Sequence, residues 1–309
     1  MKMEELKLNS SVAGKYKLTV RKPDGEVRLE TDWFDNLITN KGLDNYFASG
    51  ISSVMTYCHV GSGTSTPTVT QTSLDNRIMS TSTRSSSTQS ANGSAPYEST
   101  SIATYRFAAV GGATNISEIG VSPSTDNLGA SLTSRALILD VSGSPITISL
   151  NTGEVLDATY ALSMYPSLYA GDYSHTAVIS GNTYTFTWRA GSVGNPRFWN
   201  PEGGMGSTAM ASTVANTGLT AITSVPYAGV YSQATIGSYT NGNYYNTLSY
   251  FFDLNDGNFA NGINAIGIGG GNGFGAPSVF TYQCGVSPSI PKLSTQTLSY
   301  TVNASISRY

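Results

Sequence analysis

Short runs in which apolar and polar residues alternate recur along most of the chain. KYKLTV (15–20) and EVRLET (26–31) alternate on either side of PDG, which predicts a β-hairpin. Tyr184, Phe186 and Trp188 alternate in the same way. Such runs recur at roughly ten-residue spacing, separated by turn residues. The pattern predicts an all-β protein of β-sandwich-like antiparallel sheets.

One segment favours a helix. In DWFDNLITNKGLDNYF we expect Asp35 or Asn36 to cap a short helix near residues 35–47. Gly42 lowers the helix propensity of its centre. The apolar residues expected on its buried side are Leu37, Ile38, Leu43, Tyr46 and Phe47.

We expect two β domains. The first covers residues 1–165 and carries the charged hairpin and the helix, whereas the second covers 166–309 and is rich in Gly and Tyr. A single domain is the alternative. Residues 80–94 have no apolar period, which predicts an exposed loop. GVSPS occurs at 120–124 and again at 285–289, and we interpret both copies as turns at strand ends.

Charge is scarce. Charged residues make up 11% of the chain, against about 25% in an average soluble protein, and the net charge is -3. Nucleic-acid binding needs clustered Lys and Arg, so this function class is not expected. There is no apolar run of the roughly 20 residues that a membrane helix needs, and the N-terminal residues lack the apolar core of a signal peptide. We therefore expect synthesis in a host cytoplasm, without membrane insertion.

The motifs that suggest catalysis or cofactor binding lack the rest of their sites. GIGGGNGFG (267–275) is followed by a strand-like segment, whereas a dinucleotide loop needs a helix there. DLNDGN (253–258) lacks the bidentate Glu of a calcium loop, although a calcium site from distant loops stays open. Cys58 and His59 are neighbours on one strand and point to opposite faces, so they do not share a zinc ion.

No catalytic, cofactor-binding or metal-binding residue is therefore predicted, and we do not expect an enzyme. The two cysteines, Cys58 and Cys284, are expected to be free thiols, with a disulfide as the alternative.

Tyrosines gather in YSQATIGSYTNGNYYNTLSY (231–250). Tyrosine gives a large contact area at low entropy cost, which favours a surface for a partner or a glycan. Packing between strands or subunits is the alternative. The candidate contact residues are Tyr231, Tyr239, Tyr244 and Tyr245.

Several short motifs occur in a characteristic order. FDNLITNKGL (34–43), VGSG (60–63), NISEIG (115–120) and SRALI (134–138) follow one another along the chain. In this order they resemble a family of tailed-bacteriophage virion proteins of the tail fibre or minor structural protein type. The resemblance spans nearly the whole chain, except for residues 190–260.

The resemblance implies a structural, tail-associated component of the virion (fibre, collar or tail tip) that serves assembly and host attachment. It implies a homo-oligomer that contacts other virion proteins and a host surface glycan, and it carries no catalytic residues. The candidate residues for docking on the particle are Lys17, Arg21, Arg28, Trp33 and Phe34. Removal of residues 1–50 is expected to abolish incorporation and to leave a folded remainder.

Two alternatives stay open. One is a head fibre or capsid decoration protein. The other is a carbohydrate-binding adhesin or a depolymerase.

Overall fold

The fold is built from strands and one helix. The computed structural model describes residues 6–92, 95–124, 131–166, 172–190, 210–218, 230–233, 235–270 and 279–309. Over these ranges the chain forms strands β1 to β22 and one helix, α1. The prediction of an all-β protein with antiparallel sheets and one short helix is confirmed.

The contacts divide the chain into two compact units. Unit 1 comprises Met1–Ser11, Ser90–Ser99 and Tyr165–Ser307, and unit 2 comprises Val12–Gln89, Thr100–Met164 and Arg308–Tyr309. Strand β1 (Leu6–Arg21) therefore contributes residues to both units. The domain boundary expected at 165 stays a prediction, because neither unit is a single continuous segment.

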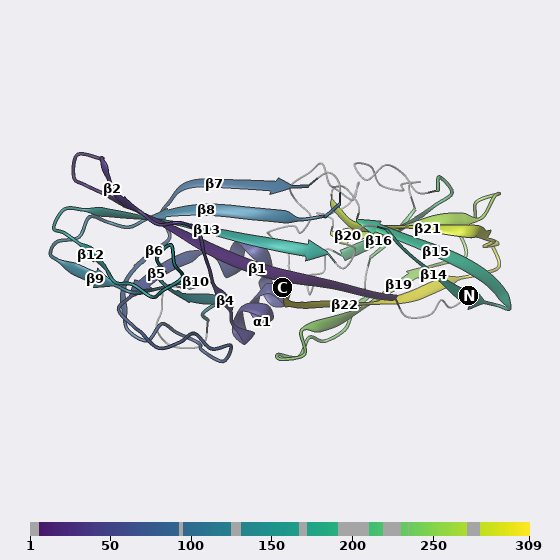
Figure 1. The fold of residues 1–309 in the computed structure, drawn as a ribbon. Helices are drawn as coiled ribbons and strands as arrows, with labels where there is room; N and C mark the ends of the chain where they lie inside the picture. The colour runs from purple at the N-terminus through teal and green to yellow at the C-terminus, as the bar shows by residue number, and fades with distance from the viewer. Residues whose placement is uncertain are drawn as a thin grey trace. The chain divides into compact units, whose positions relative to one another are not determined.

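Unit 2 contains two main sheets (Figure 1). In one sheet, β1 is followed by β13 (Val155–Pro166), β8 (Ser99–Arg106) and β7 (Arg84–Ala91), while β2 (Val27–Glu30) and β3 (Phe34–Asp35) also pair with β1. The order in the other is β4 (Leu37–Ile38), β11 (Ser134–Leu137), β10 (Glu118–Ser122), β5 (Tyr57–Gly61) and β6 (Arg77–Thr81). A separate pair joins β9 (Thr114–Ile116) to β12 (Ile148–Leu150).

The core of unit 2 lies between these sheets. Tyr16, Leu18 and Val20 of β1 are fully buried and alternate with Lys15, Lys17 and Thr19 on the other face, as the hairpin pattern predicts. The Tyr16 ring lies 4.7 Å from that of Tyr160 on β13. Its hydroxyl group lies 2.7 Å from Ser134 Oγ on β11, so this hydrogen bond joins the two layers.

Helix α1 (Asn40–Val54) begins later than we expected. Thr39 is its N-cap and accepts a hydrogen bond from the Gly42 N–H at 2.8 Å, so the predicted cap at Asp35 or Asn36 is wrong. The preceding residues are drawn into β4, where Ile38 pairs with Ser134 of a distant strand.

Gly42 lies inside this helix because the helix passes close to the backbone of another segment. A Cβ atom at this position would collide with the Thr133 carbonyl oxygen. Glycine occupies this position despite its low helix propensity, because only a residue without a Cβ atom allows the two backbones to approach so closely. Leu43 and Tyr46 are buried as expected. The side chain of Phe47 is not among those that the structure describes.

Two predicted irregular segments are strands instead. Most of the expected loop 80–94 forms the end of β6 and all of β7. The described β7 side chains are exposed on both faces, so the strand has no apolar period and is ordered by pairing with β8. Neither copy of GVSPS is simply a turn: residues 120–122 end β10, and 285–289 lie inside β21.

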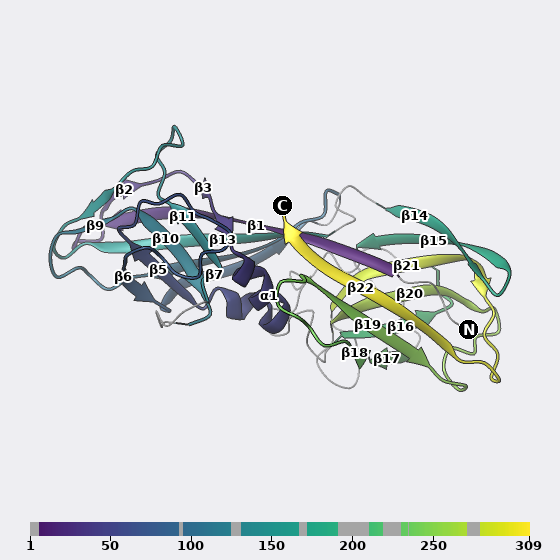
Figure 2. The same cartoon turned by 90° about the horizontal axis from the view of Figure 1, so that it is seen from below.

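Unit 1 also contains two sheets (Figure 2). In the first, β1 is followed by β22 (Leu298–Arg308), β19 (Tyr245–Phe252) and β18 (Thr235–Ile236). The second has the order β14 (Tyr173–Ile179), β15 (Asn182–Ala190), β21 (Val279–Ile290), β20 (Ile263–Gly270), β16 (Met210–Ala215) and β17 (Tyr231–Gln233).

The core of unit 1 is aromatic. The three residues of β15 whose alternation was predicted, Tyr184, Phe186 and Trp188, are all buried. On β22, the Tyr300 ring stacks 6.2 Å from that of Phe252, and its hydroxyl group hydrogen-bonds Ser212 of β16. The two sheets are therefore joined through their inner faces. Across the residues described for the whole chain, no helix has the length and apolarity to cross a membrane.

Candidate functional site

The most elaborate polar site is a buried ionic cluster in unit 2. Glu118 lies on β10 with no solvent exposure. Its Oε1 accepts hydrogen bonds from the backbone N–H groups of Gly63 (2.9 Å) and Asn76 (2.8 Å). Its Oε2 accepts from the backbone N–H of Asp75 (3.1 Å) and from Nε of Arg135 (2.8 Å). Both carboxylate oxygens are thus fully used.

Arg135 completes the cluster from the neighbouring strand. It lies on β11 opposite Gly120, diagonal to Glu118, and is also fully buried. Besides its bond to Glu118, it donates to Asp75 Oδ2 at 2.7 Å, and its Nη1 donates to Ser65 Oγ (3.2 Å) and to Gln71 Oε1 (3.0 Å). Each guanidinium nitrogen therefore has an acceptor, as a buried charge requires.

Gly63 makes room for the Glu118 carboxylate. A Cβ atom on Gly63 would lie 2.5 Å from Glu118 Oε1, closer than side chains are found to pack. The second glycine of the VGSG motif, Gly63, is therefore explained by sterics: only glycine lets the carboxylate approach the backbone so closely. We did not predict this role, and the only local signal was a glycine after a strand.

The cluster fastens the connection between β5 and β6. This segment, residues 62–76, contains no strand or helix, and most of its side chains are exposed. Glu118 binds backbone groups at both of its ends, and Arg135 binds side chains at Ser65 and Gln71. Because all of these groups are engaged within the chain, the cluster stabilises a loop and presents no free group for chemistry.

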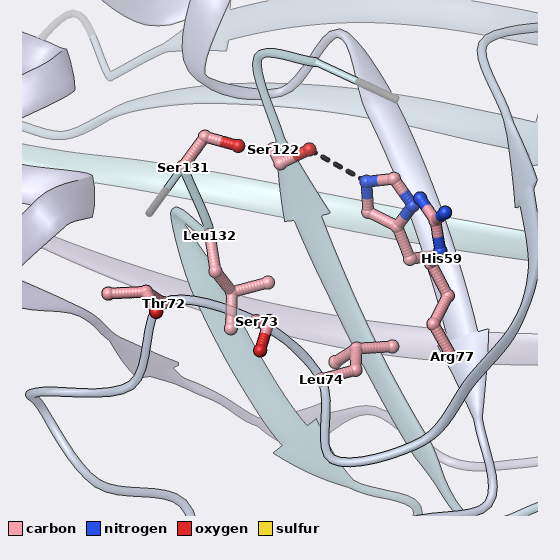
Figure 3. Close-up of a pocket in the computed structure, with 8 residues that line it drawn as sticks. All are labelled: His59, Thr72, Ser73, Leu74, Arg77, Ser122, Ser131 and Leu132. Atoms are coloured by element: carbon pink, nitrogen blue, oxygen red, sulfur yellow. Dashed lines mark hydrogen bonds between the residues drawn. The ribbon is translucent and has the colours of Figure 1, made fainter. Parts of the chain in front are cut away.

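A histidine lies at a small cavity close by (Figure 3). His59 on β5 is buried, with Nδ1 2.7 Å from Ser80 Oγ and Nε2 2.7 Å from Ser122 Oγ. Ser122 donates its own proton to the Ser124 carbonyl oxygen at 2.5 Å. His59 Nε2 must therefore carry the proton that it shares with Ser122, so Ser122 is not an activated nucleophile.

The cavity itself is small. Its volume is about 20 Å³, which suits a water molecule rather than a substrate. Burial, and secondly the charge of Arg77, lowers the pKa of His59 to about 4. The imidazole is therefore neutral at pH 7 and bridges two strands. The lining residues are His59, Thr72, Ser73, Leu74, Arg77, Ser122, Ser131 and Leu132.

Three of the predicted docking residues are engaged within unit 2. Phe34 is only 5% exposed and packs against Tyr16, so its ring belongs to the core. Arg28 Nε donates to Glu154 Oε1 at 2.5 Å, and Arg21 Nε donates to Asp157 Oδ2 at 3.0 Å. These three side chains fasten the N-terminal hairpin to its neighbours.

The other two docking candidates are more accessible. Lys17 pairs with Glu30 at 2.6 Å on the outer face of the hairpin. Trp33 is 41% exposed, with Lys15 Nζ 5.1 Å from the centre of its ring. The docking role of all five residues stays a prediction.

The arginines also shift the acidity of their partners. Hydrogen bonds from Arg28 outweigh the effect of burial and lower the pKa of Glu154 to about 2. Burial alone would raise the pKa of Asp157, but bonds from Arg106 and Arg21 reverse this, and its pKa is lowered. Both carboxylates are therefore ionised at pH 7 and act as structural anions.

The predicted tyrosine contacts belong to unit 1. Tyr245 begins β19 and is 47% exposed, while Tyr239 and Tyr244 are half-buried. Tyr231 lies in β17, and its side chain is outside the description. We missed Phe251, which is 56% exposed and lies on the same face of β19 as Tyr245. The alternation of apolar and polar residues in YNTLSYFF is the sequence signal that could have placed Phe251 on this face.

The part of the chain that is described holds no cluster of three or more His, Cys, Asp or Glu residues arranged for a metal ion. In the DLNDGN turn, Lys292 Nζ donates to Asn258 Oδ1 at 2.9 Å and brings its charge near Asp253 and Asp256. Cys58 and Cys284 are both buried free thiols.

Comparisons with protein-family models, with curated proteins and with solved structures found no match.

Proposed function

We propose that this chain is a structural component of a tailed phage particle, associated with the tail as a fibre, collar or tail-tip protein. One observation carries the proposal. The motifs on which the family resemblance rests supply Gly63, Glu118 and Arg135, and these residues meet in one buried cluster. The motifs thus supply the residues that hold the loop 62–76 against the sheet, and a protein that bears force in an assembly needs such fixed loops.

The arrangement of buried charges supports a structural role. Glu154, Asp157, Glu118 and Arg135 are all buried and bonded within the chain. Removing one partner from the Glu118–Arg135 pair, which is buried on both sides, costs several kcal/mol. The arginine partners of Glu154 and Asp157 are partly exposed, so those pairs contribute less. Rigid sheets with fastened loops transmit force and hold a fixed position in an assembly.

A second candidate function is a carbohydrate-binding adhesin, because exposed aromatic rings lie on an otherwise polar face of unit 1. Host attachment by a tail protein would join the two functions. The alternative of a head fibre or decoration protein shares the same chemistry and differs only in its position on the particle.

The composition of purified particles tests the proposal. Particles of the phage that encodes this chain would be purified on a density gradient, washed in high salt and analysed by quantitative mass spectrometry. We expect the chain in a fixed ratio to the major tail protein. Its absence from washed particles, with the protein present in the infected cell, would refute a virion role.

Removal of residues 1–50 does not test docking. Residues 1–50 include β1, whose Tyr16, Leu18 and Val20 are fully buried. Since each buried side chain contributes about 1.5–3 kcal/mol, removal of this strand would unfold the protein rather than only undock it. Substitution of the exposed Trp33 tests docking without this complication.

A further inference from the structure

The outer face of β19 and β22 in unit 1 is uncharged. Residues Tyr245, Thr247, Ser249 and Phe251 of β19 alternate with buried residues and point away from the core. Opposite them on β22 lie only serine, threonine and asparagine side chains, as in the pairs Thr247–Asn303 and Ser249–Thr301. No outward side chain of these two strands, both described over their whole length, carries a charge.

Two aromatic rings mark the ends of this face. Tyr245 is 47% exposed and Phe251 is 56% exposed. They are six residues apart on one face of one strand, so their Cα atoms are about 20 Å apart. Only an extended ligand can contact both rings at once.

Hydrogen-bonding groups fill the space between the rings. Thr247 Oγ1 donates to Asn303 Oδ1 at 2.7 Å, which fixes the orientation of that amide. The hydroxyl groups of Ser249 and Thr301 lie directly opposite one another, and neither has a partner among the described residues. A hydroxyl group can both donate a hydrogen bond to a ligand and accept one from it.

We propose that this face, defined by Tyr245, Phe251, Ser249, Thr301 and Asn303, binds an extended neutral polysaccharide. Sugar rings offer apolar C–H faces that stack on aromatic side chains, and hydroxyl groups that pair with serine, threonine and asparagine. This assignment rests on the host-attachment part of the proposed function and names its ligand class.

The distribution of apolar groups argues against a protein partner. Protein interfaces have an apolar centre and a polar rim. This face has the reverse arrangement, with hydroxyl and amide groups in the centre and aromatic rings at the two ends. Nucleic acids and anionic glycans are disfavoured because the outward side chains of the two strands include no cation.

The test uses the purified full-length chain and variants Tyr245→Ala, Phe251→Ala and the double variant. Tyr173→Ala is the matched control, because Tyr173 is 57% exposed but lies on β14 in the other sheet of unit 1. Affinity electrophoresis and calorimetry would be run with neutral polysaccharides (dextran, mannan, galactan and neutral O-antigens) and with acidic ones (hyaluronate and polysialic acid). Circular dichroism verifies that each variant folds.

We expect at least one neutral polysaccharide to bind, with affinity falling about tenfold in each single variant and unchanged in Tyr173→Ala. Absence of binding to the whole neutral panel, preference for acidic polymers, or binding insensitive to both substitutions would overturn the assignment. A loss of oligomer mass in the double variant by ultracentrifugation would overturn it in favour of contact between copies. Because the readout is binding by the purified chain, a negative result leaves the particle-composition test of the proposed function independent.

Discussion

The Arg135 guanidinium and the Glu118 carboxylate lie 2.8 Å apart on adjacent strands, and neither side chain is exposed to solvent. A surface ion pair contributes little to stability, whereas a buried pair is costly to break because one charge remains without a partner. The 2.8 Å bond is one member of a network that joins β10 and β11 to the loop 62–76. The loop and the sheet should therefore lose stability together.

Glu118→Gln should lower the free energy of unfolding by about 3 kcal/mol, because Arg135 then keeps only the partly exposed Asp75 carboxylate as its counter-ion, and the amide nitrogen of glutamine cannot accept the hydrogen bonds that a carboxylate oxygen accepts. Urea denaturation followed by circular dichroism measures the change. Glu30→Gln is the control, since Glu30 pairs with Lys17 at an exposed site and should change stability by less than about 1 kcal/mol. Equal effects of the two substitutions would show that the cluster is not an anchor.

Gly63→Ala tests the steric part of the cluster. The added methyl group would meet Glu118 Oε1, so we expect a loss of about 1–3 kcal/mol and a lower melting temperature. Gly111→Ala is the matched control because a Cβ atom there meets no atom within 4 Å. Indistinguishable melting curves for the two variants would contradict the close approach described above.

The lowered pKa of His59 predicts that the free energy of unfolding decreases in mild acid. Its pKa falls from 6.5 in the unfolded chain to about 4 in the folded protein, so the unfolded chain binds the proton first. Stability is therefore complete above pH 6.5 and declines as the pH falls towards 4, by about 3 kcal/mol in total. Urea unfolding at a series of pH values from 7 to 4.5 measures the slope. In His59→Gln, the slope over this range should be shallower, and an unchanged slope would exclude His59 as its source.

Glu154 should titrate at lower pH than an ordinary glutamate. Its pKa is lowered from 4.5 to about 2 by hydrogen bonds from Arg28, so the stability that it contributes is present above pH 4.5 and is lost as the pH falls towards 2. Carbon-detected NMR of the side-chain carboxyl group measures the midpoint. Arg28→Ala should move it up towards 4.5, and a midpoint that does not move would show that Arg28 is not the cause.

Local patterns could be predicted from the sequence, and long-range pairings could not. The burial of Tyr184, Phe186 and Trp188 follows from a period of two within one strand. The start of α1 was missed because Ile38 pairs with Ser134, far along the chain, and β7 was missed because its order comes from pairing rather than from an apolar face. Such pairings leave no periodic signal in the strand itself.

The ionic cluster shows the same limit. The backbone donors to Glu118 lie 55, 43 and 42 residues before it, and Arg135 lies 17 residues after it. The motifs containing Gly63, Glu118 and Arg135 were visible as sequence, but nothing in any one of them indicates that the three meet. The tyrosine-rich segment indicated an aromatic surface, yet Phe251 was found only once its strand face was known.

Immunogold labelling of purified virions tests the proposed association with the tail most directly. A short epitope inserted after Ser142, in the exposed turn that contains Val141 (86% exposed), would be labelled with gold-conjugated antibody on purified particles and imaged by electron microscopy. We expect gold at the tail in a symmetric arrangement. Label confined to the head would contradict the tail assignment, and unlabelled particles that nevertheless carry the full wild-type set of structural proteins would contradict the structural role itself.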